Sequence, residues 1–255
     1  MQQEMGRRII LTIAALMAFA AASVAQDTQV QNRPYTDLRP FHFGVMVGTH
    51  LQDLEFVNVG PQTVTTVDGT AEKLITTDQD RWDPGFTVGV IGEFRLGTHF
   101  AFRLAPAMYF GTRNIRFLNL TDKTGSGANV TQTQELKTIY VSGAAELLFS
   151  APRFNNHRPY LLAGFNPMLN LSGSDSDYIK LKRYDLFLEV GLGCDFYLPF
   201  FKLRPELKFC YGLINNLDTG HPKRFNDPSM ADRFMYANSV KKSRSKIIAL
   251  TFYFE

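Results

Sequence analysis

The feature that most constrains this chain is a two-residue alternation that recurs in eight separate stretches. Large apolar side chains occupy every second position, and small, polar or charged side chains lie between them. In residues 184–198, for example, Leu188 and Val190 alternate with Glu189 and Gly191. Successive side chains of a β-strand point to opposite faces, so this period predicts strands with one apolar face.

The eight predicted strands are long, and short and long connections alternate between them. Their bounds are 41–51, 86–96, 100–110, 139–149, 160–171, 184–198, 201–211 and 247–254. The short connections are 97–99, 150–158 and 199–200, and the long ones are 52–85, 112–135, 172–183 and 215–242. Most of these strands exceed the ~5–6 residues that are usual in globular proteins. The pattern predicts an all-β fold, an eight-stranded antiparallel transmembrane β-barrel of the bacterial outer-membrane type, with long extracellular loops and periplasmic termini.

The first 25 residues have the pattern of a cleaved signal peptide. Arg7 and Arg8 precede an apolar run over residues 9–22, and Ser23-Val24-Ala25 provides a small-residue cleavage site. The alternative is an uncleaved N-terminal anchor, but the run is shorter than the ~20 residues of a spanning helix. We therefore expect a signal peptide over 1–25, an extended periplasmic tail over 26–40 and a barrel over 41–255.

Composition argues against several function classes. The net charge of +3 includes the two arginines of the signal peptide, so there is no basic excess for nucleic acid. The five histidines have no metal-ligand spacing, and no nucleophile motif is present. Asp218 and His221 share a loop, where we expect them to be solvated rather than to act as an acid–base pair. We predict no enzyme activity, no cofactor and no small-molecule substrate.

Charged residues occupy many of the positions that the alternation assigns to the interior. An eight-stranded barrel is just wide enough for side chains to fill it, and buried charges require partners. We therefore predict a structural lumen ion-pair network and no open pore; a proton or ion path is the alternative. The predicted members are Glu93, Arg95, Arg103, Glu146, Asp185, Glu189, Asp195, Arg204, Glu206 and Lys208.

Several local features complete the expected barrel. Pro106, Pro167 and Pro205 interrupt strands, so each predicts a bulge. Asp68-Gly69 predicts a hairpin that projects from the first long loop, or that adds two strands to the barrel. Phenylalanines gather near the expected periplasmic strand ends as a membrane-boundary girdle: Phe41, Phe43, Phe94, Phe100, Phe149, Phe196, Phe200, Phe201 and Phe254. Cys194 and Cys210 fall on opposite faces of neighbouring strands, which predicts free thiols.

Three segments carry a resemblance to a known family: residues 32–44, residues 184–216 and residues 250–254. The second contains Leu188-Glu189-Val190-Gly191-Leu192-Gly193-Cys194-Asp195 and then Pro205-Glu206-Leu207-Lys208-Phe209. All three resemble the PorT family of outer-membrane barrels of Bacteroidota. The resemblance implies a component needed by the type IX secretion system, which carries proteins with a C-terminal sorting domain across the outer membrane. The resemblance implies no active-site residues. Glu255, which follows Phe254, is a departure from the family's aromatic ending.

Four functional hypotheses follow. The first is a secretion-system barrel that acts through contacts with other secretion-system proteins, besides outer-membrane lipid. The second is a structural or adhesive barrel with no secretion role. The third is an outer-membrane enzyme, which would need a Ser, a His and a carboxylate that converge at one rim. The fourth is an open porin, which the strand count disfavours.

Overall fold

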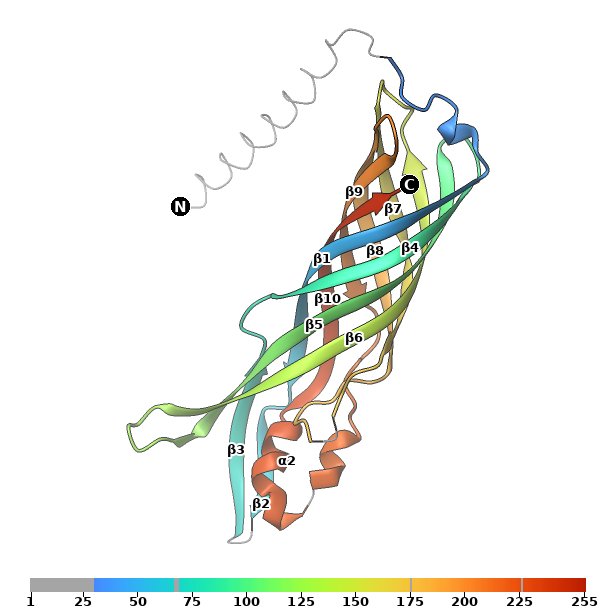
Figure 1. The fold of residues 1–255 in the computed structure, drawn as a ribbon. Helices are drawn as coiled ribbons and strands as arrows, with labels where there is room; N and C mark the ends of the chain where they lie inside the picture. Colours follow the sequence, from blue (N-terminus) through green and yellow to red (C-terminus); the bar gives the residue numbers. More distant parts are fainter. Residues whose placement is uncertain (1–29, 67–68, 175, 226) are drawn as a thin grey trace, which may run out of the picture.

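The structure is a closed antiparallel barrel of eight strands. It is a computed structural model, which describes residues 30–66, 69–174, 176–225 and 227–255. The sheet order is β2-β3-β5-β4-β1-β10-β9-β8-β7-β6, and β5 also pairs with β6, which closes the ring (Figure 1). The predicted fold class is therefore confirmed. The expected signal peptide, residues 1–25, lies outside the described residues.

Eight strands form the wall and two form a hairpin at one end. The wall strands are β1 (Phe41–Asn58), β4 (Asp83–Arg95), β5 (Phe100–Lys123), β6 (Asn129–Ser150), β7 (His157–Asn170), β8 (Tyr184–Tyr197), β9 (Lys202–Gly212) and β10 (Val240–Phe254). The hairpin consists of β2 (Pro61–Thr66) and β3 (Gly69–Asp78), and β3 pairs with the outer part of β5. The hairpin projects beyond the ring, as expected, and does not widen it. In the described part of the chain, no helix is long and apolar enough to cross a membrane.

The alternation in the sequence places the side chains as predicted. Along β1, Phe43, Val45 and Val47 are exposed on the outer wall, while His42 and Met46 are buried inside. Because side chains alternate between the two faces, placing the apolar residues of a strand on the outer wall also places the residues between them in the lumen. The lumen is therefore the core of the molecule.

Two of the predicted long loops contain regular structure that the alternation did not predict. Residues 112–135 mostly continue β5 and β6 as a paired extension beyond the ring (Figure 1). Inward and outward positions still alternate there, and the two strands still pair from Thr112↔Lys137 to Asn119↔Val130. Residues 215–242 contain η3 (His221–Phe225), η4 (Pro228–Met230) and α2 (Ala231–Ala237). Alternation identifies strands but gives no sign of these short helices. Of the three, α2 and η4 pack against the β2–β3 hairpin, and η3 packs against α2.

The three strand prolines do not mark bulges, so that prediction is wrong. The pairing stays in register through Pro106↔Gly143, Pro167↔Leu186 and Pro205↔Phe252. The register shifts among the described strands lie at Val57/Asn58 and Asn119/Lys123. All three proline side chains face the outer wall, and each strand tolerates the loss of one ladder donor without inserting a residue.

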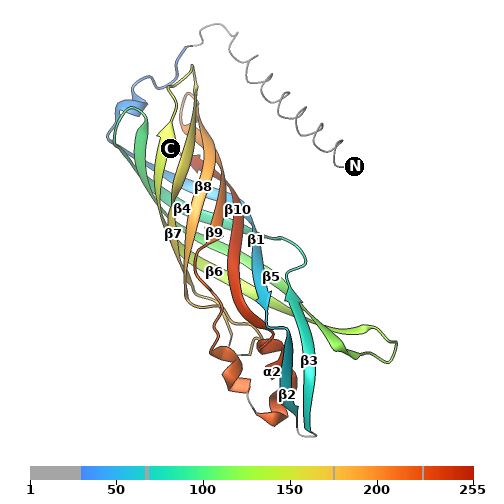
Figure 2. The same cartoon turned by 180° about the vertical axis from the view of Figure 1, so that it is seen from behind.

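The N-terminal tail folds over the end of the barrel that carries the short turns. It is not uniformly extended as expected, because η2 (Thr36–Leu38) forms a turn of 3₁₀ helix. Figure 2 shows this segment beside the short turns and the C-terminus, at the end opposite α2. Barrels of this type have short periplasmic turns and longer extracellular loops, so we call this end the periplasmic end and the opposite one the extracellular end.

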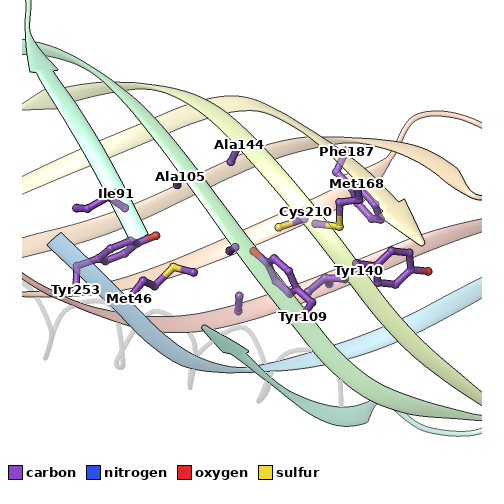
Figure 3. Close-up of a cluster of buried hydrophobic side chains, with 13 residues drawn as sticks. Met46, Ile91, Ala105, Tyr109, Tyr140, Ala144, Met168, Phe187, Cys210 and Tyr253 are labelled. Carbon is purple, nitrogen blue, oxygen red and sulfur yellow. The ribbon is translucent and has the colours of Figure 1, made fainter. Parts of the chain in front are cut away.

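The two larger apolar clusters lie at different heights along the barrel, and a small third one consists of Leu148, Tyr160 and Leu162. The cluster inside the barrel includes Met46, Ile91, Tyr109, Phe187 and Tyr253 (Figure 3). A second cluster lies at the outer end, where side chains of the hairpin, α2 and the loops meet: Leu54, Val64, Ile75, Ile115, Phe117, Leu136, Ile179, Leu181, Leu217, Ala231, Met235, Tyr236 and Val240. We call this second cluster the outer cap.

Candidate functional site: a charged lumen closed at both ends

Arg103 is the centre of the charged lumen. Its guanidinium is fully buried and donates to Glu206 Oε2 at 2.7 Å, Glu93 Oε2 at 3.1 Å and Glu146 Oε2 at 3.2 Å. It also lies over the ring of Tyr253, with 4.8 Å between Cζ and the ring centroid. The three carboxylates come from β4, β6 and β9, so a single arginine ties four strands of the wall together.

Glu206 is saturated with donors. Besides Arg103, it accepts a hydrogen bond from Tyr160 Oη at 2.7 Å and one from Tyr253 Oη at 3.0 Å. Charge-assisted hydrogen bonds of this kind are roughly twice as strong as neutral ones, and they replace the water that a buried carboxylate loses.

A second group of charges lies toward the periplasmic end. Arg204 reaches Asp195 Oδ1 at 2.6 Å and Glu93 Oε2 at 2.7 Å, and Lys202 reaches Glu255 Oε2 at 2.6 Å. His42 also contacts the Glu255 carboxylate. Although burial favours its neutral form, the His42 hydrogen bond and the charges of Lys202 and Arg204 lower the pKa of Glu255 to about 2.

A third group lies nearer the middle of the barrel. Lys208 Nζ lies 3.0 Å from Glu146 Oε1 and 3.8 Å from Glu189 Oε2. Glu189 accepts further hydrogen bonds from Asn166 at 2.7 Å and from the Cys210 thiol at 3.2 Å. Cys210 is buried in the lumen, Cys194 is half-buried on the other face of its strand, and both are free.

Eight of the ten predicted network residues lie in these three groups, and two lie elsewhere. Arg95 is half-buried at the periplasmic rim, where it donates to the carbonyls of Gly97 and Leu38. Asp185 is buried near the outer end and accepts from Asn216 rather than from a cation. The predicted network did not include four further residues that the structure places in or near the lumen: Lys202, His42, Glu255 and Arg113.

Arg113 lies above the network and is fully buried. It donates to Gln52 Oε1 at 3.0 Å and to Ser245 Oγ at 2.9 Å, and it lies over the Tyr140 ring. The sequence does indicate that Arg113 is buried, because it continues the alternation in which Arg103, Ala105 and Tyr109 point into the lumen. It was missed because residues 112–135 were expected to be a loop.

The periplasmic end is covered by the tail. The Arg153 guanidinium lies 3.7 Å from the centroid of the Tyr197 ring and donates to the carbonyls of Asn32 and Arg33. Asp37 accepts from Tyr197 Oη at 2.6 Å and pairs with Arg158 at 3.7 Å. We call this set of contacts the tail clasp.

The extracellular end is covered by the outer cap, which polar contacts hold in place. Gln62 donates to the Met235 carbonyl at 2.6 Å, so β2 is joined to α2. Gln134 makes two hydrogen bonds with the backbone of Ile179, each at 2.9 Å. On the hairpin side, the hydrogen bond from Lys73 lowers the pKa of Asp122.

Within the described ranges, no group of three or more His, Cys, Asp and Glu side chains is placed to hold a metal ion. His221 is not solvated as expected, since it is buried against Phe225 and its Nε2 contacts the Asp177 carbonyl. The cavity at the periplasmic rim, between Asp37, His42 and Lys202, is about the size of one water molecule, with ≈ 20 Å³.

A closed eight-stranded ring with an apolar outer wall and a charged, packed interior defines the chain as an outer-membrane β-barrel protein. It belongs to the family described as outer membrane protein beta-barrel domain, whose sequence profile matches residues 25–218. This family assignment places the protein in the bacterial outer membrane.

Comparison with solved structures gives distant similarity only. Neisserial surface protein A is 16% identical, with 84% of this chain and 98% of that chain covered and a TM-score of 0.39. Ail, the attachment invasion locus protein of Yersinia pestis, solved with the heparin analogue sucrose octasulfate, is 12% identical, with 85% and 99% covered and a TM-score of 0.38. No curated protein matches the chain significantly.

Proposed function

We propose that this barrel is a non-conducting component of type IX protein secretion, which acts through protein–protein contacts at its two ends. The observation that carries the non-conducting role is the lumen, where Arg103, Arg204 and Lys208 are each bound by two or more carboxylates. A barrel filled in this way leaves no room for a folded or unfolded cargo chain. Its contribution to secretion then depends on the surfaces it presents.

The periplasmic surface is suited to a protein partner. Tyr35 is 76% exposed and Leu38 is 61% exposed on the tail, which the tail clasp holds across the lumen end. Exposed apolar side chains on an ordered polar segment are typical of protein contact sites, where aromatic residues are enriched. The resemblance of residues 32–44 to the PorT family includes both residues.

Deletion and complementation in the native host test this function. Deletion should abolish the release of sorting-domain cargo, and the wild-type gene should restore it. A Tyr35→Ser/Leu38→Ser variant should reach normal outer-membrane levels and restore release poorly. Val59→Ser, which removes an exposed apolar side chain at the opposite end, is the matched control. Normal cargo release from the deletion strain would disprove the secretion role.

A structural or adhesive role is the second candidate, and the extracellular hairpin favours it. β5 and β6 extend as a pair far beyond the ring, and the turn after Lys123 carries small and polar residues. A rigid, solvated projection of this kind can reach another surface. In this case deletion would leave secretion intact and would reduce surface binding, which a cell-attachment assay measures in the same strains.

A further inference from the structure

A groove of ≈ 520 Å³ lies on the outer wall, between the outer parts of β4, β5 and β6. The connection 79–82 bulges away from the wall before β4 begins (Figure 1), and Arg81 of this connection lines one end of the groove. Its apolar part is lined by Phe86, Phe110 and Ile139, and the rings of Phe86 and Phe110 stack with 4.8 Å between centroids. Its volume is in the range of small-molecule sites.

The height of this groove in the membrane follows from the strands. Phe100 lies in the periplasmic aromatic girdle, and Phe110 is ten residues further along β5. Ten residues of a strand tilted by about 40° climb about 25 Å along the barrel axis, which is the height of the apolar band of such barrels. Phe110 therefore lies at the outer boundary of the hydrocarbon, and the groove opens into the outer-leaflet headgroup layer.

Two cations lie at the polar end of the groove. The Arg81 side chain is 73% exposed, and its Nε contacts Asp83 at 3.2 Å, so its two terminal nitrogens are left to face solvent. The Asp83 carboxylate is already occupied, because Asn114 donates to it from both its backbone and its side chain. Lys137 is exposed on β6, with no ion-pair partner among the described side chains. Glu135 lies on the same face, two residues beyond Lys137.

We propose that this groove binds an outer-leaflet lipid that carries phosphate on its headgroup, of the lipid A type. The stacked Phe86 and Phe110 rings and Ile139 contact the acyl chains, and Arg81 and Lys137 bind the phosphate. An arginine guanidinium suits this position because its planar donors match phosphate oxygens. Free phosphate has no acyl chains to contact the rings, and the phosphate of a zwitterionic phospholipid is accompanied by an ammonium group that the two cations repel.

The test is lipid retention by the purified full-length protein. The protein is exchanged into detergent, incubated with bisphosphorylated lipid A, and the bound copies are counted by native mass spectrometry. Loss of both cations in Arg81→Ala/Lys137→Ala should weaken retention by about tenfold, since each cation near an anionic surface contributes a severalfold preference. Lys123→Ala/Lys241→Ala, which removes two exposed cations elsewhere at the extracellular end, should leave it unchanged. Heat-modifiable electrophoretic migration shows that all variants are folded.

Two further probes separate the two halves of the proposed site. Dephosphorylated lipid A should bind the wild type as weakly as lipid A binds the double variant. Phosphatidylethanolamine should be retained poorly by every variant. Three results would each overturn the proposal. The first is equal retention of lipid A by the wild type and the double variant, and the second is equal retention of lipid A and dephosphorylated lipid A by the wild type. The third is displacement of lipid A by pyrophosphate alone.

Discussion

Glu255, the last residue of the chain, places its carboxylate inside the barrel, 2.6 Å from the ammonium of Lys202. The Glu255 carboxylate thereby helps to close the lumen at its periplasmic end, because it also lies 3.6 Å from Arg204 and contacts His42. The residue that departs from an aromatic chain ending is thus a member of the charged core.

Glu255→Gln should destabilise the barrel by about 3 kcal/mol, because removal of one partner leaves buried cations without compensation. Urea unfolding in lipid vesicles, followed by tryptophan and tyrosine fluorescence, measures the change. Glu72→Gln, at an exposed position of the hairpin, should change the free energy of unfolding by less than about 0.5 kcal/mol. Equal midpoints for the two variants would contradict this role of Glu255.

The same carboxylate makes stability depend on pH in a defined window. The pKa of Glu255 is lowered to about 2 from its ordinary 4.5, so the folded state binds this proton less readily than the unfolded state. The stabilisation from Glu255 is therefore complete above about pH 4.5 and is lost as the pH falls through about 2. The difference in unfolding free energy between wild type and Glu255→Gln should shrink over this range. A difference that stays constant would refute the assignment.

Arg103→Met should be among the most destabilising single substitutions, at about 3–5 kcal/mol, because Glu93, Glu146 and Glu206 would then face one another with their shared cation removed. The double variant Arg103→Met/Glu206→Gln should regain part of the lost free energy of unfolding, since one of the three negative charges is removed as well. Denaturant titrations of the wild type, Arg103→Met, Glu206→Gln and the double variant form a double-mutant cycle. Strictly additive effects would show that the two side chains act independently.

The packed lumen should not conduct ions. In planar bilayers the wild-type protein should give no steady channel, while a variant with Arg103, Arg204 and Lys208 changed to serine should give transient openings if it still folds. Heat-modifiable migration again reports folding. Steady wild-type conductance would show that the ion pairs leave a continuous path.

The tail clasp should control access to the periplasmic end. Arg153→Ala removes the guanidinium that lies on Tyr197 and binds the carbonyls of Asn32 and Arg33, so the tail should be cleaved faster by added protease. Arg39→Ala, at an exposed position of the same tail, should be cleaved at the wild-type rate. The measurement is the half-life of the intact N-terminus in vesicles with an accessible periplasmic face.

Much of the wall could be predicted from the sequence, since the polarity of alternate positions indicates which side chains face lipid and which face the lumen. The alternation assigned Glu189, Arg204 and Glu206 to the interior, where they lie. It failed where the pattern continued with polar residues, as in the outer part of β5 that contains Arg113. The bulge predicted at Pro205 was also wrong. A proline in the sequence shows that one ladder donor is missing, but it does not show whether the strand tolerates that loss at the lipid face.

Alternation along the chain is enough to give the number of wall strands, the face to which each side chain points and the need for charges to meet inside. Which charges meet depends on the folded barrel. Arg103 and Glu206 are 103 positions apart and become neighbours only when β5 and β9 face each other across a closed, tilted ring. A two-residue period describes each strand alone, whereas contacts across the lumen depend on strand order, register and closure together.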